Sequence, residues 1–227
     1  MENKIVFLPG FLGSPQDWSK YSNYFSKKYK CITPSLLDIK DLKTFGEKLP
    51  SNAHLVGYSM GGRISLWLHF LFPKKFSSLC CISSNPGLKG GRMKRLSEDQ
   101  KWLKLMSTLS VEDFIKKWYD QPMFYNCPIP KERMNCDLKR WSEILQKFTI
   151  AKQPCFWDDL FKIKIPVLFL FGERDEKYKQ IGNRLNTMDS EINTKIIKNC
   201  SHVVHLEAPD TCVYELEKHL ERCNVKR

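Results

Sequence analysis

Gly57-Tyr58-Ser59-Met60-Gly61 places a serine between two glycines in the pattern Gly-x-Ser-x-Gly. The apolar pair Leu55-Val56 precedes the pattern and a helix-like run over 62–72 follows it, so we expect a strand, a sharp turn and a helix. Such a turn strains the serine backbone, and the flanking glycines remove side chains that would clash there. Ser59 is therefore a candidate catalytic residue; the alternative is a glycine-rich helix start capped by a serine.

A carboxylate and a histidine later in the chain complete a candidate catalytic triad. Asp175 and His202 each follow a predicted late strand, in the chain order Ser59, Asp175, His202. In such a triad the histidine takes a proton from the serine, and the carboxylate holds the imidazole in the required tautomer. His205 is the nearby alternative, but we favour His202 because it directly follows the turn Asn199-Cys200-Ser201.

An oxyanion formed beside Ser59 needs two N–H donors. Met60, the residue after the serine, supplies one, and the loop after the first strand supplies the other. Phe11 is our candidate in that loop. Pro9 precedes it and has no N–H, so we expect this loop to have an altered shape.

Arg63 lies four positions after Ser59 on the same predicted helix. Residues at this spacing share one helix face, with Cβ atoms about 5–6 Å apart. A guanidinium binds a carboxylate through two parallel hydrogen bonds, so its position indicates an anionic substrate. The alternative is a structural salt bridge between the helix and its neighbours.

Strands that alternate with helices must position these residues. The pattern predicts a mostly parallel sheet flanked by helices, whose carboxyl-terminal strand ends collect the catalytic groups. The predicted strands are residues 4–8, 31–33, 54–56, 79–83, 165–171 and 194–197. A closing helix is predicted over 210–221.

The alternation stops after the loop-like stretch 84–91. From 92 to 161 only helices are predicted: one with Met93, Leu96, Leu103 and Met106 near one face, one capped at Ser110 and ending before Pro122, and one from Pro130 to about Lys147. We therefore divide the chain into a core over 1–88, an inserted helical lid over 89–161, and the rest of the core over 162–227.

Composition excludes several classes of protein. The chain has 227 residues, a formal net charge of +12 and a hydrophobic fraction of 42%. Its lysines are scattered, which disfavours a nucleic-acid-binding module. No apolar run is long enough to cross a bilayer, and the run after the N-terminus is too short for a signal peptide. Nine cysteines without metal-ligand spacing predict free thiols, a cytoplasmic location, and no metal or organic cofactor.

Five segments resemble one known family. They are Gly57-Tyr58-Ser59-Met60-Gly61-Gly62-Arg63, Asn85-Pro86-Gly87-Leu88, Trp118-Tyr119-Asp120-Gln121-Pro122-Met123-Phe124, Gln153-Pro154 and Gly172-Glu173-Arg174-Asp175-Glu176-Lys177-Tyr178. Together they are similar to the 2-succinyl-6-hydroxy-2,4-cyclohexadiene-1-carboxylate synthases, the MenH family of menaquinone biosynthesis. The resemblance spans nearly the whole chain, including the predicted lid.

The resemblance implies an α/β-hydrolase fold and a lyase activity without a cofactor. The implied substrate is a small polycarboxylate, 2-succinyl-5-enolpyruvyl-6-hydroxy-3-cyclohexene-1-carboxylate, from which the enzyme eliminates pyruvate. The triad serine is implied to act as the base, and the oxyanion hole to hold an enolate. The triad alone also fits a carboxylesterase or thioesterase that acts on an anionic substrate.

The resemblance also implies substrate-binding residues. In this chain they are Tyr58, Arg63, Arg95, Trp118 and Arg133. The resemblance implies three cations that bind substrate carboxylates, of which Arg63 and Arg95 are two. The position of the third is ambiguous, because counting back from Gln153 gives Arg133 whereas counting forward from Pro122 gives Lys139. Trp118 also fits packing within the lid. Pro9 stands where the family usually has histidine, and Ser201 where it usually has glycine.

Overall fold

Six strands form one sheet in which every pairing is parallel. The computed structural model describes residues 3–188 and 192–225. The strand order is β2-β1-β3-β4-β5-β6. The strands are β1 (Lys4–Leu8), β2 (Lys30–Ile32), β3 (Ala53–Tyr58), β4 (Phe76–Ile82), β5 (Val167–Gly172) and β6 (Ile192–Ile197). The predicted parallel sheet is confirmed, and each predicted strand overlaps an observed one.

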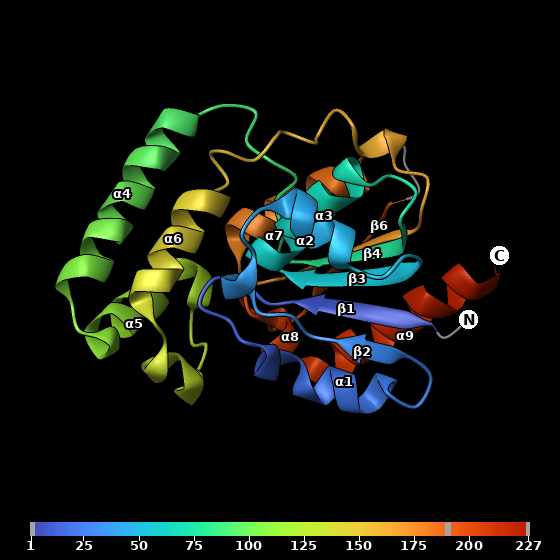
Figure 1. The fold of residues 1–227 in the computed structure, drawn as a ribbon, viewed down its shortest axis with the longest axis horizontal. Helices are drawn as coiled ribbons and strands as arrows, with labels where there is room; N and C mark the ends of the chain where they lie inside the picture. The colour runs from blue at the N-terminus through green and yellow to red at the C-terminus, as the bar shows by residue number, and fades with distance from the viewer. Residues whose placement is uncertain (1–2, 189–191, 226–227) are drawn as a thin grey trace.

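Helices cover both faces of this sheet (Figure 1). β3 and β5 are buried at every position, as expected for strands without a solvent-facing side. Alternate residues of each strand enter two separate cores. The helices of one face are α2 (Leu42–Lys48), α3 (Met60–Leu71) and α7 (Glu176–Asn186), and those of the other are α1 (Ser19–Phe25), α8 (Val204–Glu207) and α9 (Pro209–Val225). We did not predict α7 or α8 from the sequence.

The lid segment, residues 89–161, joins β4 to β5 and lies beside the carboxyl-terminal ends of β1 and β3 (Figure 1). Its residues are all described, and they form helices and 3₁₀ turns without a strand. These elements are α4 (Arg92–Thr108), α5 (Val111–Tyr119), η3 (Pro122–Phe124), η4 (Lys131–Asn135), α6 (Leu138–Phe148) and η5 (Leu160–Lys162).

The prediction of one continuous helix from Pro130 to Lys147 is wrong. A 3₁₀ turn, η4, occupies the first part, and Cys136 then takes an extended conformation with ψ 145°. Asp137 caps the true helix, because its carboxylate accepts a hydrogen bond from the Arg140 N–H at 3.0 Å. An aspartate at this position favours a helix start over a helix interior.

Three buried histidines make the fold sensitive to mild acid. Burial lowers the pKa of His69 and of His219 to about 4, and holds that of His205 well below its usual value. The unfolded chain titrates these groups near 6.5, so below that pH it binds more protons than the folded state does. The contribution of these histidines to the free energy of unfolding is therefore fully present above pH 6.5 and is lost as the pH falls toward 4.

We expect the urea midpoint of unfolding to fall between pH 7 and pH 5. At pH 5 each of these histidines is expected to lower the free energy of unfolding by on the order of 1–2 kcal/mol, because one pKa unit corresponds to about 1.4 kcal/mol. Ordinary carboxyl groups remain ionised across this window, so the change reports the histidines. Equal midpoints at the two pH values would contradict this assignment.

Candidate active site

Ser59 lies at the junction of β3 and α3 in a strained backbone conformation. Its φ is 49° and its ψ is −109°, which a residue with a side chain rarely adopts. The neighbouring glycines permit the turn: a Cβ on Gly57 would lie 2.4 Å from the Gly61 carbonyl carbon, and one on Gly61 would lie 2.2 Å from the Leu8 oxygen. The glycine pattern therefore reflects close packing of three backbone segments around Ser59.

Ser59, His202 and Asp175 form a hydrogen-bonded row. His202 Nε2 lies 3.0 Å from Ser59 Oγ, and His202 Nδ1 lies 2.6 Å from Asp175 Oδ2. Asp175 follows β5 and His202 follows β6, so the ends of neighbouring strands bring them together. The Tyr178 N–H also donates to Asp175 Oδ1 at 3.3 Å, which helps to orient the carboxylate. This is the geometry in which an imidazole exchanges a proton with the serine.

His205 lies outside this row. It is fully buried, and its ring packs 4.2 Å from the Tyr58 ring and 4.9 Å from the Trp18 ring, measured between centroids. The structure therefore gives His202, and not His205, the contact with Ser59.

Phe11 and Met60 both line the cavity next to Ser59. Among the described residues, no backbone carbonyl accepts a hydrogen bond from the N–H of either one. The Gly13 N–H donates to the Gly10 oxygen at 3.0 Å and closes a turn around Phe11. The two N–H groups therefore have no backbone acceptor among the described residues, which is one condition for an oxyanion hole.

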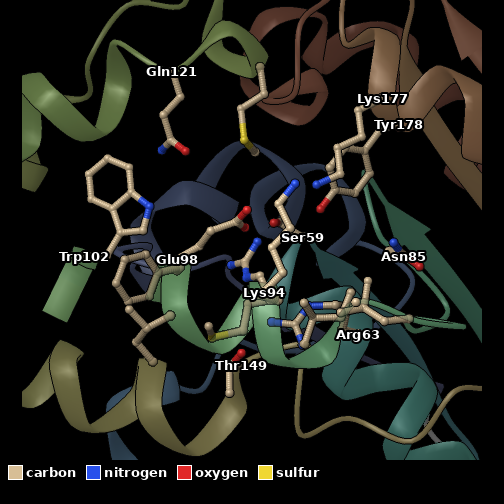
Figure 2. A pocket seen from close by; sticks show the side chains of 18 of the residues that line it. Ser59, Arg63, Asn85, Lys94, Glu98, Trp102, Gln121, Thr149, Lys177 and Tyr178 are labelled. Atoms are coloured by element: carbon tan, nitrogen blue, oxygen red, sulfur yellow. The ribbon is translucent and has the colours of Figure 1, made fainter. Parts of the chain in front are cut away.

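A cavity of about 450 Å³ opens above Ser59, between the core and the lid segment. Figure 2 shows Trp102 and Gln121 of the lid segment on one side and Lys177 and Tyr178 of α7 on the other. Four cations line it, namely Arg63, Lys94, Arg95 and Lys177, against a single carboxylate, that of Glu98. The cavity therefore has a positive charge that suits an anionic ligand.

Arg63 is buried and is held by two neutral oxygen acceptors. Its Nη1 donates to Gln153 Oε1 and its Nη2 to the Phe148 carbonyl, each at 2.9 Å. Within the described part of the chain no carboxylate pairs with it, so it is not the structural salt bridge considered from the sequence. Burial lowers its pKa to about 10. A buried guanidinium held only by neutral acceptors favours a bound anion.

Arg95 reaches the same cavity from α4. Its Nη2 lies 2.9 Å from Asp99 Oδ1, one helical turn away. Asp99 is buried and also accepts a hydrogen bond from the Thr149 hydroxyl. The carboxylate therefore orients Arg95 and offsets part of its charge.

Two of the residues implied as substrate contacts do not line the cavity. Arg133 is buried in an ion pair with Asp17, with 2.6 Å between its Nη2 and Oδ2. Tyr58 lies beneath the site, with its ring 5.4 Å from that of His202. Trp118 does line the cavity and also packs within the lid segment, 4.8 Å from Trp102.

Lys94 and Lys177 are cavity cations that the sequence analysis did not single out. Lys139, the alternative to Arg133, is exposed on α6 and does not line the cavity. The only sequence signal for Lys177 was its place two residues after Asp175, where a side chain at the start of a helix faces the strand ends.

Ser201, at the position where the resembling family usually has glycine, is tied to α8. Its N–H donates to Glu207 Oε2 at 2.8 Å, and its hydroxyl donates to Glu207 Oε1. A Cβ on Gly172 would lie 1.9 Å from the Ser201 carbonyl oxygen. The loop that carries His202 is therefore packed directly against the end of β5.

Residues 5–215 match the family described as the alpha/beta hydrolase family. The chain belongs to the alpha/beta hydrolase family. A solved structure of MenH from S. aureus is 25% identical to this alpha/beta hydrolase, with a TM-score of 0.86 over 99% of this chain and 96% of that one. An esterase from Thermogutta terrifontis, 14% identical with a TM-score of 0.75, shares the fold.

Curated relatives carry the name that the sequence motifs indicated. A Bacillus subtilis (strain 168) protein provisionally named 2-succinyl-6-hydroxy-2,4-cyclohexadiene-1-carboxylate synthase is 27% identical over 234 residues, which cover 90% of this alpha/beta hydrolase and 85% of that protein. Protein PHYLLO, chloroplastic, of Arabidopsis thaliana is 25% identical over 260 residues, covering 96% of this chain, which spans only 15% of PHYLLO. The predicted family resemblance is confirmed.

Two kinds of feature are absent from the residues that the structure describes. Over residues 3–188 and 192–225, no helix is both long and apolar enough to cross a bilayer. Across the same ranges, no group of three or more histidine, cysteine, aspartate or glutamate side chains could hold a metal ion.

Proposed function

We propose that this protein is a lyase that eliminates pyruvate from 2-succinyl-5-enolpyruvyl-6-hydroxy-3-cyclohexene-1-carboxylate, giving 2-succinyl-6-hydroxy-2,4-cyclohexadiene-1-carboxylate. The observation that carries the proposal is Arg63, a buried guanidinium one helical turn from Ser59 that pairs with no carboxylate among the described residues. A pocket for a neutral ester gains nothing from such a charge. The names of the relatives support the proposed product, 2-succinyl-6-hydroxy-2,4-cyclohexadiene-1-carboxylate.

In this proposal Ser59 acts as a base toward carbon. His202 holds the serine proton, and the serine oxygen takes the acidic ring proton beside the succinyl ketone. The electron pair of that C–H bond moves toward the ketone, and the N–H groups of Phe11 and Met60 stabilise the resulting enolate oxygen. The enolate then re-forms the ketone and a ring double bond at the deprotonated carbon, the existing ring double bond shifts by one position, and the C–O bond to the enolpyruvyl group breaks, which leaves the 2,4-diene. The enolate of pyruvate that leaves takes up the proton that Ser59 removed and becomes pyruvate.

The substrate carries three carboxylates, and the cavity offers cations on three elements. Arg63 belongs to α3, Arg95 to α4 and Lys177 to α7. We assign the third carboxylate to Lys177 in place of Arg133, because Lys177 lines the cavity and Arg133 does not. Asp175 next to this lysine holds His202, so a carboxylate bound by Lys177 would lie close to the reacting atoms.

A direct test offers the purified protein the enolpyruvyl substrate and, separately, a neutral 4-nitrophenyl ester. Pyruvate is measured with a lactate dehydrogenase coupled assay, and 4-nitrophenolate by its absorbance. We expect pyruvate release with a much higher kcat/KM than ester cleavage. Fast ester cleavage without pyruvate release would favour the esterase alternative, since the triad geometry serves either reaction.

Lys177→Met is expected to raise KM for the enolpyruvyl substrate by roughly three- to tenfold, because an exposed ion pair with substrate is worth about 1 kcal/mol. The matched control is Lys179→Met on the same helix, since Lys179 pairs with Glu176 at 2.5 Å and does not line the cavity. Steady-state kinetics at low and at high salt measure both variants. Equal KM values for Lys177→Met and wild type would remove Lys177 from the binding site.

A further inference from the structure

Arg133 and Asp17 form a buried ion pair between the lid segment and η1 (Pro15–Trp18), the 3₁₀ helix that follows the first loop of the core. Arg133 Nη2 lies 2.6 Å from Asp17 Oδ2, and the two side chains are only 4% and 5% exposed. Arg133 Nε also lies 3.4 Å from the Tyr119 hydroxyl of α5. Burial alone would lower the pKa of Arg133, but Asp17 and Tyr119 raise it above its usual value, so Arg133 remains charged. Such a pair adds little net stability over apolar side chains, yet it fixes the relative position of its two segments.

Asp17 is also the residue that holds the loop after β1. Its Oδ2 accepts a hydrogen bond from the Ser14 N–H at 3.1 Å. A Cβ on Gly13 would lie 2.8 Å from the same oxygen, so the loop backbone packs directly on the carboxylate. Inside this loop Leu12 has a φ of 62°, which is unfavourable for a leucine and requires support from its surroundings.

Phe11 lies within the same turn and carries the N–H that we assign to the oxyanion hole. Its ring packs against the lid segment, 4.8 Å from the Trp118 ring and 5.4 Å from the Trp141 ring. The lid segment therefore contacts this loop directly through the Phe11 ring, and is linked to it indirectly through Asp17, which pairs with Arg133 and accepts the Ser14 N–H. A change in either contact would move the Phe11 N–H relative to Ser59.

We propose that Arg133 is a positioning residue whose ion pair with Asp17 holds the loop of residues 10–14 against the lid segment and so places the Phe11 N–H for oxyanion binding. The inference rests on the role of Phe11 in the proposed function. It assigns Arg133 an effect on the reaction rate without contact to the substrate. Loss of the pair then slows every reaction that uses the oxyanion hole, whichever substrate is bound.

The test uses a probe that reports on the oxyanion hole without requiring the natural substrate. Diethyl 4-nitrophenyl phosphate reacts with an activated serine: Ser59 Oγ forms the new P–O bond, 4-nitrophenolate leaves, and the serine proton passes to His202. The second-order rate constant of labelling is measured for wild type and for Arg133→Lys, Arg133→Met and Arg133→Met with Asp17→Asn. Kinetics on the enolpyruvyl substrate and thermal melts accompany each variant.

The double variant separates positioning from stability. It leaves no unpaired charge in the interior, and the asparagine side chain that replaces Asp17 retains an oxygen for the Ser14 N–H, so its melting temperature is expected to exceed that of Arg133→Met. We nevertheless expect labelling and kcat to stay about ten- to a hundredfold below wild type, with KM within about twofold, because small misplacements of catalytic groups have effects of this size. For Arg133→Lys, the labelling rate and kcat are expected to lie between those of the double variant and those of wild type.

Arg140→Met is the matched control. Arg140 pairs with Asp38 at 3.4 Å and likewise joins the lid segment to the core, but this pair is exposed. Wild-type labelling by the folded double variant would overturn the proposal, as would a tenfold rise in KM at an unchanged labelling rate, which is the result for direct substrate contact. If the wild type releases no pyruvate but labelling falls as expected, the proposed function fails while the positioning role stands.

Discussion

Ser59→Ala is expected to lower kcat/KM for pyruvate release by at least about 10³-fold, because removing the reacting member of a triad leaves only the catalysis supplied by the oxyanion hole and by binding. The change deletes one oxygen that is held by His202 at 3.0 Å. The melting temperature is expected to stay within a few degrees of wild type, or to rise, because alanine tolerates the turn no worse than serine does. The coupled pyruvate assay and a thermal melt measure the two effects.

The two histidines provide the matched comparison for this prediction. His202→Gln is expected to reduce turnover about as strongly as Ser59→Ala, since the two residues act as a unit. His205 packs against the Tyr58 ring, so His205→Gln is expected to change the melting temperature more than kcat/KM. Near-normal turnover in His202→Gln, or in Ser59→Ala itself, would show that the row of Ser59, His202 and Asp175 does not carry the chemistry.

Arg63→Ala is expected to reduce kcat/KM for the enolpyruvyl substrate by roughly 30- to 4,000-fold. Truncating one partner of a buried charge pair costs about 2–5 kcal/mol, and here the partner is a substrate carboxylate. Arg63→Lys is expected to recover only part of this loss, because an ammonium group cannot reproduce the planar fork that now contacts Gln153 and Phe148. Steady-state kinetics on the three proteins measure the effect.

Arg92→Met is the control for Arg63. Arg92 also donates hydrogen bonds to main-chain carbonyls, those of Ala151 and Gln153, but it does not line the cavity. Its loss is expected to lower the melting temperature with little change in kcat/KM. If Arg63→Ala behaves in the same way as Arg92→Met, the guanidinium is structural and the tricarboxylate proposal loses its main support.

The sequence was sufficient for the parts of the site that depend on local structure. Gly57, Ser59 and Gly61 predicted the strained turn, because only glycines allow three backbone segments to approach so closely there. The predicted parallel sheet then accounted for the meeting of Asp175 and His202, because each follows a strand and parallel strand ends lie at one edge of the sheet.

Contacts between distant segments could not be predicted in this way. Arg133 pairs with Asp17, which lies 116 positions away, and no pattern in either segment indicates the other. The approach of Lys177 to the cavity depends on how α7 packs, whereas a lysine on an amphipathic helix usually lies in solvent. By contrast, the break before α6 was predictable in principle, because Asp137 is a typical helix cap.

The insertion of the lid segment between β4 and β5 has a consequence for the assembly of the sheet during synthesis. Leu79 of β4 pairs with Val167 of β5, so the centre of the sheet joins two strands that are far apart in the chain. A ribosome that has completed β4 must still translate the whole lid segment before β5 emerges. Throughout that interval the edge of β4 that later pairs with β5 has unpaired N–H and carbonyl groups, so the nascent chain is exposed to aggregation until β5 emerges.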